Sequence, residues 1–297
     1  MGKAPIFFCA LGIAIIQADG SIRAALPGGL PQEAASDRRL ARILARTKDY
    51  CRRLENAALD FVCIEDIKEE FFHLPGIEVD TVEPGHTPRW PFSYRIPRKG
   101  FVRTFIHDYQ LIRKDGQRVE TRTLIKENGI PRNEKNAQLT TMSVRVENAL
   151  FGPVGLLSEA RQAAFEYRLA GEKKVEGRKA LLVDAIPKPE FPGVHCNGRI
   201  WILEGDASIV KIEWEQTSVG NYRAIRETAE RLKAEPSLVS ATEYDVLKNG
   251  IRFPSRDTTE ESYLMKKNKK FVRSKSTILY RDYRFFSVET DVRVLGD

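Results

Sequence analysis

Apolar and polar residues alternate along most of the chain beyond residue 100, a pattern typical of strands with one buried face. In RIWILE and IVKIEWEQ, which flank the turn EGDAS, apolar residues recur at every second position. KDGQ, ENG and KNG separate other runs of this kind, and Asp-Gly and Asn-Gly are strong hairpin signals. The predicted strands are 59–72, 102–113, 118–127, 165–171, 179–186, 199–203, 209–216, 240–247, 251–265 and 270–283.

Three segments show helical spacing instead. From Ser36, a candidate N-cap, apolar residues recur at intervals of three, four and seven to about Glu55, which predicts an amphipathic helix. Residues 153–164 predict a short helix, and residues 221–234 another with Asn221 as its cap. Between the first helix and the hairpins, residues 75–98 hold five prolines and predict an extended loop.

Together these elements predict an α+β fold. We expect a large, curved antiparallel sheet, a half-barrel, with a few helices. No internal repeat divides the chain and no linker is long enough to separate two domains. Residues 36–297 are therefore expected to form a single antiparallel half-barrel domain.

The first residues of the chain predict where in the cell the protein is located. Lys3 precedes an uncharged run, Ala4 to Ala18, which is short for a membrane span and fits the apolar part of a signal peptide. We expect residues 1–18 to be a signal peptide cleaved after Ala18, and residues 19–35 to be a flexible leader. The alternative is a retained N-terminal anchor. The first interpretation predicts an exported protein, periplasmic or associated with the outer membrane.

Composition and charge narrow the classes of partner. The 297 residues are 42% hydrophobic and 30% charged, which excludes a disordered chain, a collagen and a polytopic membrane protein. The net charge is +7, but lysines gather at expected hairpin tips such as MKKNKKF, among compensating carboxylates. We therefore expect no nucleic-acid partner, and consider a membrane surface the better use of these lysines.

Export would permit disulfides. Cys51 and Cys63 are twelve residues apart and can bridge only if the chain turns between them, as the predicted helix and strand would require. The alternative is two buried free thiols. Cys196 is then unpaired, with a buried or edge thiol as its simplest interpretation.

A search for catalytic motifs finds none, and we expect no catalytic residue, no metal site and no cofactor. The four histidines share no metal-ligand spacing. His107-Asp108 is interpreted as a surface pair in a strand. A hydrolase that uses His195 or Cys196 is the less favoured enzymatic alternative, because neighbouring side chains in a strand point to opposite faces.

Aromatic residues gather on the later predicted strands and are the most suggestive feature. One interpretation is an ordinary core; the other is the wall of a concave cavity for an apolar ligand. The candidate ligand-binding residues are Trp201, Trp214, Tyr244, Phe253 and Tyr263.

Two stretches, GRIWILEGDASIVKIEWEQ (198–216) and GIRFPSRDTTEESY (250–263) followed by STILYRDYRFFSVET (276–290), resemble the lipoprotein-sorting and lipoprotein-carrier superfamily of the outer membrane. The resemblance covers residues 36–290 by pattern and implies an exported half-barrel, similar to uncharacterised exported bacterial proteins. It carries over no catalytic residue. It implies a non-enzymatic periplasmic protein that binds a lipid, an acyl chain or another apolar ligand. The alternative is a structural or interaction protein of the cell envelope, whose partner would be another envelope protein.

Overall fold

The structure is a computed structural model and describes residues 30–57, 61–73, 100–114, 117–137, 139, 149–191, 196–219, 222–266 and 269–286. The expected signal peptide, most of the expected leader and the proline-rich loop 75–98 lie outside these residues. No helix in these ranges combines the length and the apolar character needed to cross a membrane.

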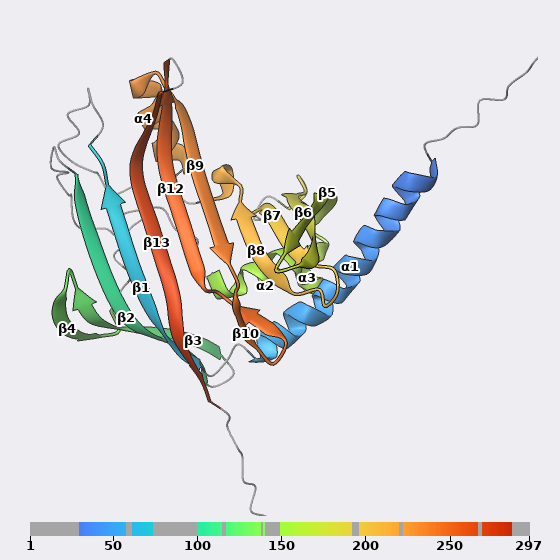
Figure 1. The fold of residues 1–297 in the computed structure, drawn as a ribbon, viewed down its shortest axis with the longest axis horizontal. Coiled ribbons are helices and arrows are strands. Elements are labelled where there is room, and N and C mark those ends of the chain that lie inside the picture. Colours follow the sequence, from blue (N-terminus) through green and yellow to red (C-terminus); the bar gives the residue numbers. More distant parts are fainter. Residues whose placement is uncertain are drawn as a thin grey trace, which may run out of the picture.

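Eleven strands form one sheet in the order β4-β3-β2-β1-β13-β12-β9-β8-β7-β6-β5 (Figure 1). Neighbours in this sheet pair antiparallel, and the sheet curves strongly without closing on itself. The expected fold class, a large curved antiparallel sheet with few helices, is therefore confirmed.

The strand bounds follow the predicted runs closely over most of the chain. They are β1 Phe61–Phe71, β2 Phe101–Lys114, β3 Gln117–Glu127, β4 Ile130–Lys135, β5 Phe165–Val175, β6 Arg178–Pro187, β7 Gly198–Leu203, β8 Ile209–Trp214, β9 Glu235–Glu243, β10 Val246–Lys248, β11 Ile251–Phe253, β12 Arg256–Met265 and β13 Lys269–Phe285.

Three strand predictions differ from the structure. The predicted strand 240–247 is divided between β9, which ends at Glu243, and β10, which begins at Val246. After β3, Asn128 and Gly129 both adopt positive φ, which suits a tight hairpin turn, and the chain returns as β4, a strand absent from the prediction. The predicted strand 251–265 is interrupted at Pro254, which cannot donate to a ladder, so that β11 pairs only with β10 as a separate two-stranded sheet.

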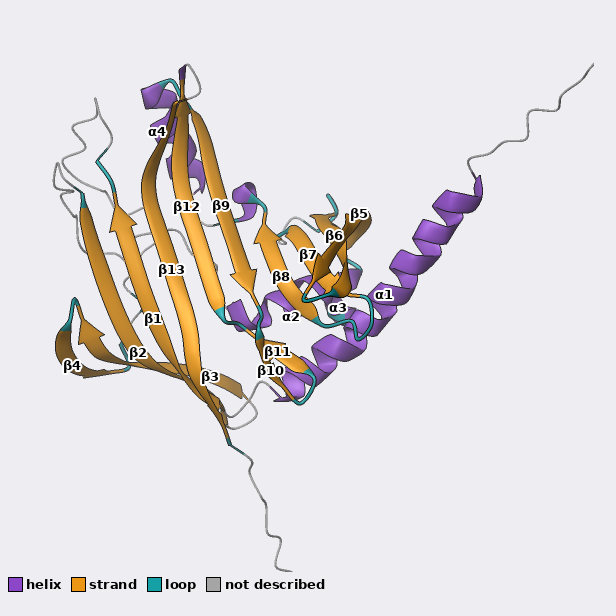
Figure 2. Cartoon of the chain, in the orientation of Figure 1, coloured by secondary structure: helices purple, strands orange, loops and turns teal. Residues whose placement is uncertain are grey.

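The helices lie at one end and at the top of the sheet (Figure 2). Helix α1 (Leu30–Ala57) begins six residues before the predicted cap Ser36, and its first turn contains Pro31, a residue that the first helical turn tolerates. The predicted helix 153–164 is two short helices, α2 (Gly152–Leu157) and α3 (Glu159–Gln162), because Ser158 between them has extended backbone angles. Helix α4 (Tyr222–Leu232) packs on β9 and β12.

One row of paired residues crosses nine strands of the sheet, from β2 to β5, and shows which side chains share a face. It runs through Phe105, Ile67, Ile278, Asp257, Thr242, Ile212, Ile200, Val183 and Leu169. Since partners in antiparallel register point to the same side, all of these lie on one face, which we call the inner face. Near the middle of the row, Thr242 Oγ1 donates to Asp257 Oδ2 (2.7 Å), a buried polar pair between apolar ends.

The main core lies on the inner face, centred on the β5–β9 end and reaching Phe61 of β1 and Tyr109 of β2. There, Tyr50 and Leu54 of α1 and Leu156 and Leu157 of α2 pack against the buried side chains of β6, β7 and β8. Arg39 of α1 also bonds to Glu172 and Glu204 at the rim of this end, which ties the helix to the sheet. Helices therefore cover this end, and the β1–β4 end is where the inner face can take another role.

Candidate functional site

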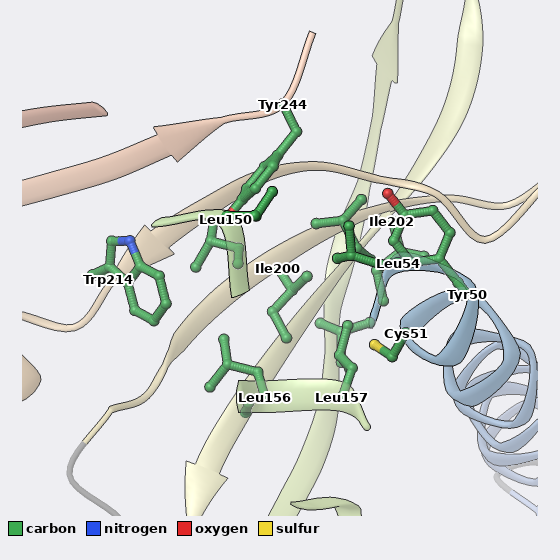
Figure 3. Packing of buried hydrophobic residues seen from close by; sticks show 14 of the residues in the cluster. Tyr50, Cys51, Leu54, Leu150, Leu156, Leu157, Ile200, Ile202, Trp214 and Tyr244 are labelled. Carbon is green, nitrogen blue, oxygen red and sulfur yellow. The ribbon is translucent and has the colours of Figure 1, made fainter. Parts of the chain in front are cut away.

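Four of the five predicted ligand-binding residues lie in the packed core. Trp214, Tyr244, Phe253 and Tyr263 all belong to the main cluster and are at most 7% exposed. Figure 3 shows Trp214 and Tyr244 beside Leu150, Leu156 and Ile200. The Trp214 indole Nε1 donates to Thr242 Oγ1 (2.9 Å), which satisfies its polar atom inside this core. These aromatics fill the inner face here, as the ordinary-core interpretation expects.

Trp201, the fifth residue, does not join them. It alternates with Ile200 and Ile202, which are buried in the main cluster, so its ring lies on the other face of β7. There it packs against a small cluster of Ala180, Leu203 and Val210, and the Lys211 ammonium lies 5.3 Å from its ring centre. Although β7 and β8 pair, Trp201 and Trp214 therefore lie on opposite faces of the sheet.

A cavity lies instead at the opposite end of the sheet. Its volume is about 480 Å³, and its lining residues come from β2, β3, β4 and the residues just after β4. They are Phe105, His107, Leu124, Glu127, Glu134, Asn136 and Ala137. Because Glu134 and Asn136 are exposed, the cavity opens towards solvent on the β4 side.

The floor of the cavity is formed by Phe105 and Leu124, which are apolar but only 3% and 8% exposed, so most of the accessible lining is polar. Phe105 and Leu124 belong to a second buried cluster with Ile67 of β1 and Ile278 of β13. The register places Ile67 between Phe105 and Ile278, so this cluster is a short apolar stretch across three neighbouring strands. A ligand in the cavity would meet hydrocarbon and one aromatic ring on this side.

A buried charged cluster adjoins that floor. Glu65 of β1 is 1% exposed, and Arg122 Nε and Nη2 donate to its two carboxylate oxygens at 2.7 and 3.1 Å. His107 Nδ1 lies 3.6 Å from Glu65 Oε2, and the His107 ring stacks on Phe105. His107 is 2% exposed, so its interpretation as half of a surface pair is wrong; the strand turns it to the inner face.

Electrostatics within this cluster favour the charged guanidinium of Arg122 and the neutral hydroxyl of Tyr109. Burial alone would lower the pKa of the Arg122 guanidinium, but the charge and hydrogen bonds of Glu65 raise it above its ordinary value. Burial and the charge of Glu120 raise the pKa of Tyr109, whose hydroxyl donates to Glu120 Oε1 (2.8 Å). The Glu65–Arg122 pair is therefore a fixed dipole beneath the cavity.

The rim carries acidic groups from the β3–β4 hairpin. Glu127 ends β3, and Arg132 Nη2 donates to its Oε2 (3.1 Å). Leu124 pairs with Glu134 in the register, so the Glu134 carboxylate stands beside the apolar floor. The turn at Asn128 and Gly129 thus folds two carboxylates over the same opening.

The cysteines are not bridged. Cys51 and Cys63 are buried thiols that form no disulfide, which matches the free-thiol alternative, and Cys196 is exposed. Cys51 Sγ donates to the Pro153 carbonyl (3.4 Å), and burial raises the pKa of its thiol to about 12. The predicted Cys51–Cys63 bridge is absent from this structure.

The described residues show no arrangement that supports the enzymatic alternative. His195 lies outside the described residues, and Cys196 stands exposed before β7. Within the described ranges, no three His, Cys, Asp or Glu side chains gather closely enough to hold a metal ion.

Sequence reasoning missed the cavity residues, although one signal was present. In strand β1, Phe61, Cys63, Ile67 and Phe71 fall on one face, and Glu65 falls in phase with them. A carboxylate at an apolar position indicates a buried partner. That the partner is Arg122, 57 residues away, follows only from the pairing of β1 with β2 and β2 with β3.

Comparisons with known proteins bear on the fold. A LolA superfamily protein from Nitrosomonas europaea is 10% identical, with 84% of this chain and 94% of that chain covered and a TM-score of 0.34. A DUF1329 family protein from Desulfovibrio piger is 10% identical, with 84% and 95% covered and a TM-score of 0.37. An outer membrane lipoprotein-sorting protein domain from Vibrio parahaemolyticus is 9% identical, with 84% and 94% covered and a TM-score of 0.38.

No protein-family model and no curated protein matches the chain. At these identities and TM-scores, the likeness carries no information on ligand or activity. The function must be argued from the residues of this chain.

Proposed function

We propose that this chain is an exported, non-enzymatic protein that binds a lipid, an acyl chain or another apolar ligand in the cavity over β2, β3 and β4. The observation that carries the proposal is the cavity itself. Its volume of about 480 Å³ falls in the range of small-molecule sites, and its mainly polar lining includes Phe105 and Leu124 of an apolar cluster. Binding would draw on apolar burial, at about 25 cal/mol per Å².

The chemistry of the lining supports binding rather than turnover. His107 is held against Glu65, which resembles the support of a general base. Yet the lining residues in the described part of the chain include no Ser, Thr, Cys or Lys that this imidazole could activate. A few polar groups beside an apolar floor fit recognition of an amphiphile.

Export is part of the same proposal. The uncharged run from Ala4 to Ala18 fits a signal peptide, and a periplasmic or outer-membrane-associated location would bring the cavity close to lipids. The lysines at the β12–β13 tip, such as Lys266, Lys269 and Lys270, are exposed or bound to surface carboxylates and would suit a membrane surface.

A titration with the uncharged apolar fluorophore 1-N-phenylnaphthylamine tests this function. We expect saturable fluorescence enhancement with the full chain, and loss of most of it in Ala137→Phe, which fills the cavity from its lining. Ala45→Phe, on an exposed position of α1, is the matched control and should bind as the parent protein does. No saturable binding, or equal binding by both variants, would refute the proposal.

A further inference from the structure

The ionisable groups around the cavity are predominantly acidic. Two carboxylates, Glu127 and Glu134, line it together with the His107 imidazole. No guanidinium or ammonium belongs to the lining residues that the structure describes. A ligand in the cavity would therefore place its polar end beside negative charge, and would leave its chain on Phe105 and Leu124.

Arginines approach the cavity from outside, but each has a carboxylate or an aromatic ring against it. Arg122 bonds to Glu65 and, at 3.2 Å, to Glu120. Arg132 bonds to Glu127. Arg103 lies over the Phe105 ring, 4.7 Å from its centre. Carboxylates thus compensate the charges of Arg122 and Arg132, whereas the ring contact by itself does not neutralise that of Arg103.

The two rim carboxylates are also differently engaged. Glu127 is half-buried and held by Arg132, whereas Glu134 is exposed and stands opposite Leu124 in the register. An ammonium near Leu124 would meet the exposed Glu134 carboxylate directly, an attraction that solvent screens in part. A carboxylate or phosphate in that place would meet repulsion from Glu134 and, weakened by the pairing with Arg132, from Glu127.

We propose that the cavity selects amphiphiles whose polar end is an amine, and rejects those that end in a carboxylate or phosphate. This inference rests on the proposed function, because it names the class of ligand for the same cavity. Apolar burial on the floor would supply affinity, and Glu127 and Glu134 would supply the selection.

Three probes of equal chain length separate apolar binding from selection by the polar end: dodecylamine, dodecanol and dodecanoate. Each competes with 1-N-phenylnaphthylamine for the full chain at pH 7.4, below its critical micelle concentration. We expect dodecylamine to displace the fluorophore at about tenfold lower concentration than dodecanoate, since charge-assisted contacts are worth about one such factor. Dodecanol should fall between them.

The double variant Glu127→Gln/Glu134→Gln should abolish or reverse this order without changing displacement by dodecanol. Glu166→Gln, an exposed carboxylate on the far edge strand β5, is the matched control and should keep the order. Equal displacement by all three probes, or a preference for dodecanoate, would overturn the selectivity while leaving apolar binding intact. If the fluorophore does not bind at all, the proposed function itself fails.

Discussion

Glu65 is a buried carboxylate, although glutamate side chains usually lie in solvent. A carboxylate that is 1% exposed must be compensated, and Arg122 does so with two hydrogen bonds. Removing one partner of a buried pair leaves the other uncompensated, which costs more than the pair contributes.

Arg122→Leu is therefore expected to lower the free energy of unfolding by about 3 kcal/mol. The reason is that Glu65 would remain buried beside the apolar floor without its counter-charge. Urea unfolding followed by circular dichroism measures the loss. The double variant Glu65→Leu/Arg122→Leu should recover most of it, and a loss below about 1 kcal/mol in the single variant would contradict this view of the pair.

Asp206, in the turn between β7 and β8, ties stability to pH. Burial opposes ionisation, but hydrogen bonds from Ser208 and Arg178 prevail and hold the pKa of Asp206 below its usual 3.8. A carboxyl with a lowered folded pKa stabilises the protein above its ordinary pKa, and this stabilisation is lost as the pH falls through the folded value.

Asp206→Asn should consequently cost less than about 1 kcal/mol at pH 7, because the group is largely solvated. The amide oxygen can still accept from Ser208, but the charge that Arg178 meets is gone. The difference from the parent protein should narrow as unfolding is measured from pH 7 towards pH 3. A difference that stays constant over this range would contradict the assigned pKa direction.

At the scale of elements, local pattern predicts most of the sheet. Alternation and turn residues locate the β2–β3, β5–β6 and β7–β8 hairpins within a few residues. The errors have local causes: β4 is short and wholly exposed, so it shows no alternation, and Pro254 breaks a run that hydrophobicity alone would continue. The predicted start of α1 is late because proline is typical both of loops and of the first turn of a helix.

Gly198 at the start of β7 tests how tightly β7 and β8 pack. A Cβ at this residue would lie 2.3 Å from the Glu213 carbonyl oxygen, so the neighbouring backbone would have to move. We expect Gly198→Ala to lose about 1–3 kcal/mol of unfolding free energy. In Gly205→Ala, where a Cβ meets nothing within 4 Å, thermal unfolding should change little. Equal effects of the two changes would show that the approach of these strands is not tight.

At the scale of the molecule, the sequence located the aromatic residues but not their role. It could not show that α1 and α2 cover the strands carrying Trp214, Tyr244 and Tyr263, because that coverage depends on contacts between distant segments. Nor could it show the cavity, whose lining from Phe105 to Ala137 forms only once β2, β3 and β4 pair. The curved sheet thus has a filled end and a hollow end.

The central claim is that the hollow end holds an apolar chain. Photolabelling with an uncharged alkyl diazirine, followed by peptide mapping, tests it most directly. We predict that labelled peptides come from β2, β3 and β4, around Phe105, Leu124 and Ala137, and that Ala137→Phe prevents the labelling. Labels on β7–β9 around Trp214, or none above the unfolded control, would contradict the account.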